Sequence, residues 1–278
     1  MDYTDKVVIL YGGTSGIGKE LLFALVSKGC NVIFTGTNEI KGNKVLEELN
    51  ILYKDSRPHN AIFQCSDITD WAGQEELYPL AEETFGKTVD IVLVIAGILD
   101  TSNLINDIEQ DGKYRTIEVN LTAAIKANRL AIQYFLKKKK GGCIVNTSSV
   151  FGLTGACTAP LYAASKHAII GLTKSYGSLL RTTDIRVNVV APHFVETPLL
   201  PGVSLGVATT FGMVSMKDCI EAYFYVLEDE TLNGDVVNVS HLGRTTEPRY
   251  SDPIIEQLDT MCNQRREDTL NGILNYFQ

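Results

Sequence analysis

The feature that most constrains the fold is a regular alternation of short apolar runs with longer helical stretches. The apolar runs are continuous and rich in Val and Ile, so they predict strands that are covered on both faces, as in a parallel sheet. The predicted strands are Val7–Tyr11, Asn31–Thr35, Ala61–Cys65, Ile91–Ile95, Cys143–Thr147, Arg186–Val190 and Val236–Val239. The predicted helices are Gly18–Ser27, Glu39–Tyr53, Trp71–Phe85, Lys113–Lys139, Leu161–Leu180 and Lys217–Glu228. This order predicts an α/β fold with one doubly wound parallel sheet of about seven strands and helices on both faces.

No internal repeat, low-complexity segment or linker rich in Pro and Gly divides the 278 residues. We therefore expect one domain over residues 1–243. A tail over residues 244–278 shows no clear strand, and we expect it to cover a subunit interface or an active site.

Composition argues against several classes of function. No segment approaches roughly 18 consecutive apolar residues, so a membrane span is not expected, and the first predicted strand begins too early for a signal peptide. The net charge of −8 argues against a nucleic-acid partner. Six cysteines without a C-x-x-C pair indicate free thiols in a reducing compartment, which favours the cytoplasm, and no metal site.

A glycine-rich run joins the first strand to the first helix, Gly12-Gly13-Thr14-Ser15-Gly16-Ile17-Gly18. Glycine lets the backbone turn tightly and approach phosphates, while the amino end of the helix supplies N–H donors. A tight turn alone would also explain the glycines. Their place between a strand and a helix favours binding of a dinucleotide pyrophosphate.

A second pattern, Tyr162-Ala163-Ala164-Ser165-Lys166, places a Tyr and a Lys four residues apart on one helix face. An ammonium group beside a phenol lowers its pKa, which is near 10 in a free Tyr. The pair therefore predicts a general acid/base, with Ser149 upstream as a partner. On its own the pattern also fits a surface Tyr and a solvated Lys.

Together these motifs resemble the short-chain dehydrogenase/reductase family over roughly residues 5–243. The glycine run, Asp67, Asn120, Ser149 and the Tyr162/Lys166 pair fall in the family's order. Within the family, three stretches are most similar to the branch that contains insect alcohol dehydrogenase and hydroxyprostaglandin dehydrogenase: Ala96–Asp100, Thr116–Leu121 and Leu232–Val239.

The resemblance implies catalytic roles for four residues. Tyr162 would exchange the proton with the alcohol or carbonyl oxygen, and Ser149 would hold that oxygen. Lys166 would lower the Tyr162 pKa and bind the nicotinamide ribose. Asn120 would bend its helix and anchor a water that links Lys166 to solvent. Ser149 and Asn120 could instead be turn or capping residues.

The resemblance also implies a cofactor site. Asp67 would hold the adenine amino group, although a helix cap before Trp71 would explain it as well. Thr197 would contact the carboxamide. The expected cofactor contacts are Gly12, Thr14, Ser15, Gly16, Ile17, Gly18, Thr37, Asp67, Ile68, Ala96, Tyr162, Lys166 and Thr197.

Three positions depart from the family pattern. The usual Asn-Asn after the fourth strand is Val94-Ile95, which would loosen the floor of the cofactor site. The usual Pro-Gly after the sixth strand is Pro192-His193, whose side chain could crowd the cofactor or donate a proton, and which we expect to point away. Gly36 stands where an acidic residue would bind the ribose of NAD. The Thr35–Asn38 segment thus favours NADP, while leaving NAD open.

Substrate contacts would come from Ser149, Phe151, Leu153 and Phe194, with Leu199 and Leu200 nearby. Their apolar character favours a hydrophobic alcohol or ketone, although these residues could equally be core. The segment from Pro198 to Met216 could close over the substrate. The resemblance implies a homodimer or homotetramer through the Lys113–Lys139 and Leu161–Leu180 helices.

The sequence therefore predicts a cytoplasmic, NAD(P)-dependent oxidoreductase with Tyr162 as acid/base. Two alternatives stay open. One is a dinucleotide-binding sensor or interaction protein that keeps the fold without catalysis. The other is a lyase or epimerase that uses the same residues.

Overall fold

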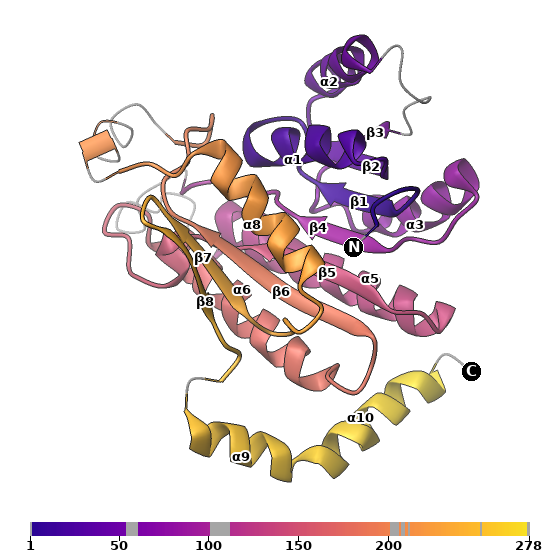
Figure 1. The fold of residues 1–278 in the computed structure, drawn as a ribbon, viewed down its shortest axis with the longest axis vertical. Coiled ribbons are helices and arrows are strands. Elements are labelled where there is room, and N and C mark those ends of the chain that lie inside the picture. Colours follow the sequence, from indigo (N-terminus) through magenta and orange to yellow (C-terminus); the bar gives the residue numbers. More distant parts are fainter. Residues whose placement is uncertain are drawn as a thin grey trace.

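The protein is described here by a computed structural model that covers residues 2–53, 61–100, 112–200, 206, 209–210, 212–250 and 252–276. Within these ranges the strands form one eight-stranded sheet in the order β3-β2-β1-β4-β5-β6-β7-β8 (Figure 1). The strands are β1 Val7–Tyr11, β2 Asn31–Gly36, β3 Ala61–Cys65, β4 Ile91–Val94, β5 Gly142–Thr147, β6 Ile185–Pro192, β7 Val236–Ser240 and β8 Gly243–Glu247. The pairs from β3 to β7 are parallel, which confirms the doubly wound α/β fold.

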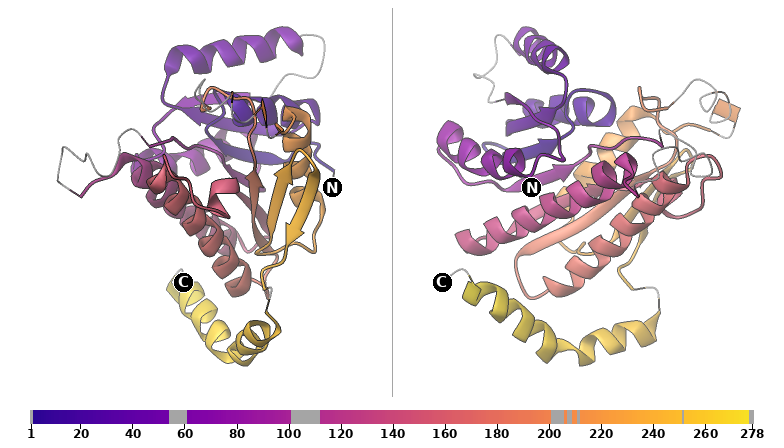
Figure 2. Two further views of the ribbon diagram at one scale, coloured as in Figure 1. Left: turned by 90° about the vertical axis from the view of Figure 1, so that its left-hand side faces the viewer. Right: turned by 180° about the vertical axis from the view of Figure 1, so that it is seen from behind.

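The helices lie in two layers around this sheet (Figure 2). One layer holds α1 Gly16–Ser27, α2 Glu39–Leu52 and α8 Met216–Glu228. The other holds α3 Trp71–Phe85, α5 Ala123–Lys138 and α6 Pro160–Leu179. Alternate strand residues face opposite layers: Val8 and Leu10 pack with the first, and Val7 and Ile9 with the second. Burial on both faces explains why these strands are continuously apolar.

The predicted helix Lys113–Lys139 is interrupted near its start. It consists of a short turn, α4 Arg115–Ile117, one turn of π-helix, η2 Glu118–Thr122, and then α5. A π turn inserts an extra residue into the helical ladder, and such turns often occur at functional sites. Asn120 lies inside this turn.

The tail departs from the expectation that it carries no clear strand. Residues Gly243–Glu247 form β8, which pairs antiparallel with β7. All five are exposed and polar or small, so they give no apolar signal in the sequence, and this strand makes the sheet eight-stranded rather than seven-stranded. Beyond β8, α9 Pro253–Met261 and α10 Asn263–Tyr276 form an arm at the end of the chain (Figures 1 and 2), and Leu270 of this arm is buried against the layer of α3, α5 and α6.

Within the described part of the chain, no helix has the length and apolar character needed to cross a bilayer.

Candidate active site

A cavity of about 500 Å³ opens at the carboxyl ends of the parallel strands. Segments that follow β1 to β6 all contribute to its walls. In open parallel sheets this edge is where ligands bind. Every residue predicted to contact the cofactor lines this cavity: Gly12, Thr14, Ser15, Gly16, Ile17, Gly18, Thr37, Asp67, Ile68, Ala96, Tyr162, Lys166 and Thr197.

The glycine run forms one wall and fits a pyrophosphate group. Gly12 and Gly16 have φ values of +91° and +54°, which residues with a side chain rarely adopt. A Cβ on Gly18 would lie 1.9 Å from the carbonyl oxygen of Gly12, so the loop can close only around glycine. The first turn of α1 begins here, and Ser15 makes no side-chain cap to it. Its N–H groups therefore remain available to an anion at the helix amino end.

Tyr162 and Ser149 meet in the deeper part of the cavity. Both are buried, with 7% and 8% of their surface exposed. Burial raises the pKa of Tyr162, and a hydrogen bond with the Ser149 side chain opposes this in part. Ser149 also accepts a hydrogen bond from the Phe151 amide, so it is a turn cap as well as a neighbour of the phenol.

Lys166 lies one helical turn from Tyr162, as the spacing predicts. Its Nζ is 5.5 Å from the centre of the Tyr162 ring and donates to the carbonyl oxygen of Thr147 at 2.9 Å. Burial lowers the pKa of Lys166 to about 8. Burial of the phenol raises the pKa of Tyr162 in this geometry, and the lowering by Lys166 that the sequence predicts stays a prediction.

Asn120 lies behind this pair rather than on the cavity wall. Its Oδ1 accepts from the Ile98 amide and its Nδ2 donates to the Ile98 carbonyl, both at 2.8 Å. A Cβ on Gly97 would lie 3.3 Å from Asn120 Oδ1 and 3.4 Å from Lys166 Nζ, so the side chains of Asn120 and Lys166 both pack closely against this glycine. The side chain of Asn120 thus joins the π turn to the segment that follows β4.

Asp67 lies at the other end of the cavity. It accepts hydrogen bonds from the amide and hydroxyl of Thr69 and forms an ion pair with Arg115. Burial raises its pKa, but these partners outweigh burial and hold the pKa of Asp67 below its usual value. The cap of α3 is Asp70, so the capping explanation of Asp67 does not apply to that helix.

The substitutions at Val94 and His193 have different consequences. Val94 is buried in β4 opposite Tyr11, and the amides of Ile95 and Ala96 both donate to the Tyr11 carbonyl. Backbone hydrogen bonds therefore hold this part of the cavity floor, and its loosening by the loss of the Asn side chain stays a prediction. His193 lines the cavity, and its side chain lies near that of Asn238 on β7. Burial lowers the pKa of His193, which favours its neutral form.

The predicted substrate residues divide into two groups. Ser149, Phe151 and Phe194 line the cavity, and the Phe151 ring packs edge-on against Phe194 and Tyr162. Leu153 instead packs against the core layer of α5 and α6, so the core alternative is correct for this residue. Leu199 and Leu200 line the cavity, whereas most of residues 201–211 in the predicted lid lie outside the described residues.

A family model for the short chain dehydrogenase matches residues 6–206 of this chain. The chain belongs to the short-chain dehydrogenase family. It is accordingly an oxidoreductase that acts on CH–OH groups.

This short-chain dehydrogenase is similar in sequence to several proteins of named activity. The 15-hydroxyprostaglandin dehydrogenase [NAD(+)] of Mus musculus is 30% identical, with 86% of this chain and 91% of the relative covered. The trans-4-hydroxycyclohexanecarboxylate dehydrogenase of Sinomonas cyclohexanicum is 32% identical, with 76% and 79% covered. The 3beta-hydroxysteroid dehydrogenase of Mediterraneibacter gnavus is 29% identical, with 77% and 75% covered. The crystal structure of levodione reductase has a TM-score of 0.77 at 22% identity, covers 86% of this chain and 97% of its own, and shares the fold.

Two residues of this short-chain dehydrogenase escaped the sequence analysis. Arg115 lines the cavity beside Asp67, and Asp100 contacts the start of α6. Arg115 lies outside every motif that predicted a cofactor contact, so no local signal in the sequence indicated it. Asp100 is linked to α6 only by tertiary structure.

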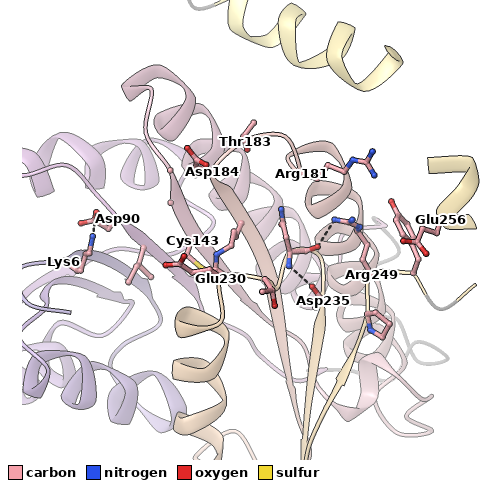
Figure 3. Close-up of a pocket in the computed structure, with 18 residues that line it drawn as sticks. Lys6, Asp90, Cys143, Arg181, Thr183, Asp184, Glu230, Asp235, Arg249 and Glu256 are labelled. Atoms are coloured by element: carbon pink, nitrogen blue, oxygen red, sulfur yellow. Dashed lines mark hydrogen bonds and ion pairs between the residues drawn. The ribbon is translucent and has the colours of Figure 1, made fainter. Parts of the chain in front are cut away.

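A second cavity, of about 790 Å³, lies at the opposite edge of the sheet, where the strands begin (Figure 3). Charged groups of both signs line it, including the Lys6–Asp90 ion pair, Arg181 and Asp184. Arg249 there donates to the carbonyls of Gly177 and Asn233. Basic groups of this cavity thus join separate chain segments to one another.

Proposed function

We propose that this enzyme moves hydride between a nicotinamide dinucleotide and the carbon of a hydrophobic secondary alcohol or ketone, with Tyr162 as general acid/base. The observation that carries the proposal is the meeting of Tyr162, Ser149 and Lys166 in one cavity with the glycine loop. A protein that only binds a dinucleotide has no need of a buried phenol hydrogen-bonded to a serine at this place.

The residues present fit the cofactor. The open amides at the start of α1 suit the pyrophosphate. Asp67, Ile68 and Lys166 line the same cavity, and we propose that Asp67 and Ile68 hold the adenine end and Lys166 the nicotinamide end. When bound, the nicotinamide ring supplies or accepts the hydride.

Proton transfer falls to Tyr162. Because burial raises its pKa, the phenol is protonated at neutral pH and can donate to a carbonyl oxygen held by Ser149. In the reverse direction the same oxygen of Tyr162 must first lose its proton. The cation of Lys166 beside the phenol favours that loss, as long as the pH stays below the Lys166 pKa of about 8.

Cofactor preference follows from the end of β2. A Cβ on Gly36 would lie 2.4 Å from Thr14 Cγ2, so the Thr14 side chain fills the space that an acidic residue at position 36 would need. Without a carboxylate there, nothing at this position repels a 2′-phosphate. We propose that the enzyme accepts NADP(H), with NAD(H) as the weaker cofactor, although the 15-hydroxyprostaglandin dehydrogenases among its relatives are named for NAD(+).

The substrate class is supported by the lining and by the names of the relatives. Phe151, Phe194, Leu199 and Leu200 form an apolar wall beside Tyr162. The named relatives act on a hydroxyprostaglandin, a hydroxysteroid and a hydroxycyclohexanecarboxylate. We propose a substrate of this kind, a secondary hydroxyl or keto group on a mainly hydrocarbon skeleton.

A homodimer or homotetramer and a cytoplasmic location complete the proposal. The outer face of α6 exposes small residues, Ala164, Gly171 and Ser175, which allow a second copy to approach closely. All six cysteines are free thiols, as expected of a reducing compartment.

The test is a Tyr162→Phe variant assayed with NADPH and a panel of hydrophobic ketones. We expect cofactor binding to persist and turnover to fall by about a thousandfold or more, because general acid catalysis and its preorganised donor are lost. Tyr176→Phe, on the same helix but outside the cavity, is the control and should keep full activity. Turnover that survives in Tyr162→Phe, or a wild-type protein that binds NADPH but turns over no substrate, would overturn the proposal.

A further inference from the structure

The helix that carries Tyr162 begins without a cap of its own. Ala159 stands at the N-cap position of α6 and has no side-chain acceptor for the first amides of the helix. Such amides need a partner when they are buried. The partner comes from a distant segment: the two carboxylate oxygens of Asp100 accept from the Leu161 amide at 3.0 Å and the Tyr162 amide at 2.7 Å.

Asp100 belongs to a segment that is held at a second point. Two residues earlier, the backbone of Ile98 is held by the side-chain amide of Asn120, whose Oδ1 accepts from the Ile98 amide and whose Nδ2 donates to the Ile98 carbonyl. Ile98 and Leu99 themselves line the cavity. The segment 97–100 therefore connects the cavity floor to the π turn through Asn120 and to α6 through Asp100.

These contacts close into a ring. The carbonyl of Tyr162 accepts from the Ser165 hydroxyl at 2.7 Å, and Ser165 accepts from Asn120 Nδ2 at 3.2 Å. Asn120 holds Ile98, and Asp100 returns to the Tyr162 amide. The backbone amide and carbonyl of Tyr162 are thus both held by one hydrogen-bond network, which runs through the π turn and the segment after β4.

We propose that Asp100 is a positioning residue, which fixes the backbone of Tyr162 relative to the cavity floor. The inference rests on the proposed acid/base role of Tyr162. A local N-cap would satisfy the same amides, but it would not join α6 to the segment that lines the cavity. Because a displacement of the order of 1 Å between reacting groups can cost about a hundredfold in rate, this cross-link acts on turnover more than on cofactor binding.

The experiment separates positioning from simple capping. Asp100→Ala removes both functions. Adding Ala159→Asp supplies a carboxylate at the N-cap, where it can accept from the same Leu161 and Tyr162 amides without contacting segment 97–100. Ala159→Asp alone is the matched control, and each variant is measured for unfolding temperature, NADPH dissociation constant and kcat.

We expect Asp100→Ala to lower both the unfolding temperature and kcat, with kcat down about tenfold to a hundredfold and the NADPH dissociation constant within about threefold of wild type. The double variant should recover the unfolding temperature but not kcat. Recovery of kcat together with the unfolding temperature would show that Asp100 only caps the helix, and unchanged kcat in Asp100→Ala would also overturn the proposal. Tyr162→Phe in the same assay detects failure of the proposed function itself: if that variant turns over normally, both proposals fall, whereas a dead Tyr162→Phe beside a fully active Asp100→Ala rejects only this one.

Discussion

At the residue scale, the chemistry depends on two buried groups that burial shifts in opposite directions. The phenol of Tyr162 is harder to deprotonate than a free Tyr, and the ammonium of Lys166 is easier to deprotonate than a free Lys. In both cases low polarity disfavours the charged form. The sequence predicts the adjacency of the two side chains from helical spacing, but it cannot predict these pKa shifts, because they depend on how deeply the fold encloses the groups.

This difference predicts the pH dependence of the reaction. Below about pH 8 Tyr162 remains protonated and Lys166 remains charged, so kcat for ketone reduction should change by less than about twofold between pH 6 and pH 8. Alcohol oxidation needs the phenolate, whose fraction grows about tenfold per pH unit below the pKa, so its kcat should rise accordingly. Both directions can be measured in one buffer series. A flat oxidation profile over this range, with chemistry limiting, would mean that the Tyr162 pKa lies below neutrality.

At the scale of elements, the positions of the strands and of most helices can be predicted from the periodicity of apolar residues, whereas the contacts between these elements cannot. Strands β1 and β3 and helix α3 have the predicted bounds, because buried parallel strands and a capped helix leave strong local signals. The π turn, the cap from Asp100 and the polar strand β8 have no such local signal. Packing also decides whether a side chain in a loop faces the cavity or the core, and Leu153 packs against the core.

The contact between the glycine loop and the end of β2 gives a prediction for cofactor choice. Gly36→Asp alone should weaken binding of both cofactors by about tenfold, because its Cβ collides with Thr14. Thr14→Ala removes Cγ2 and Oγ1, the two closest atoms, and is measured by itself because Thr14 is also an expected cofactor contact.

The combined variant Thr14→Ala, Gly36→Asp should bind NADH about tenfold or more tighter than NADPH, since the carboxylate can then bond the ribose and repel a 2′-phosphate. Titrations of all three variants with both cofactors measure this. An unchanged NADPH preference in the double variant would show that position 36 does not face the ribose.

At the scale of the whole molecule, the two edges of the sheet have separate tasks. Among the described residues, those that line the active-site cavity precede residue 201, whereas the C-terminal arm is attached near the opposite edge. The attachment centres on Asp259 of α9, which pairs with Arg181 and accepts from Ser178, and which also pairs with Arg266 of α10 within the arm. We propose that residues 1–243 carry catalysis and that residues 244–278 do not contribute to the chemistry within one chain.

This separation predicts that the arm can be loosened without loss of activity. Asp259→Ala removes the contacts of the arm to Arg181 and Ser178 and leaves the buried Arg266 of α10 without its carboxylate, so it should destabilise the attached arm by about 3 kcal/mol. Limited proteolysis within residues 252–276 should then be faster than in wild type, while kcat stays within about twofold. Exposed Glu267→Ala is the control on the same arm. A large fall in kcat for Asp259→Ala would place the arm in the catalytic mechanism.

The central claim is that the cavity at the carboxyl edge binds a nicotinamide dinucleotide through the glycine loop and Lys166. The most direct measurement is titration of the wild-type protein with NADPH and with NADH, followed by nicotinamide fluorescence, with AMP as a competitor. We predict saturable binding of one cofactor per chain, tighter for NADPH and reversed by AMP. Absence of binding for both cofactors would contradict the account of the site and of the reaction built on it.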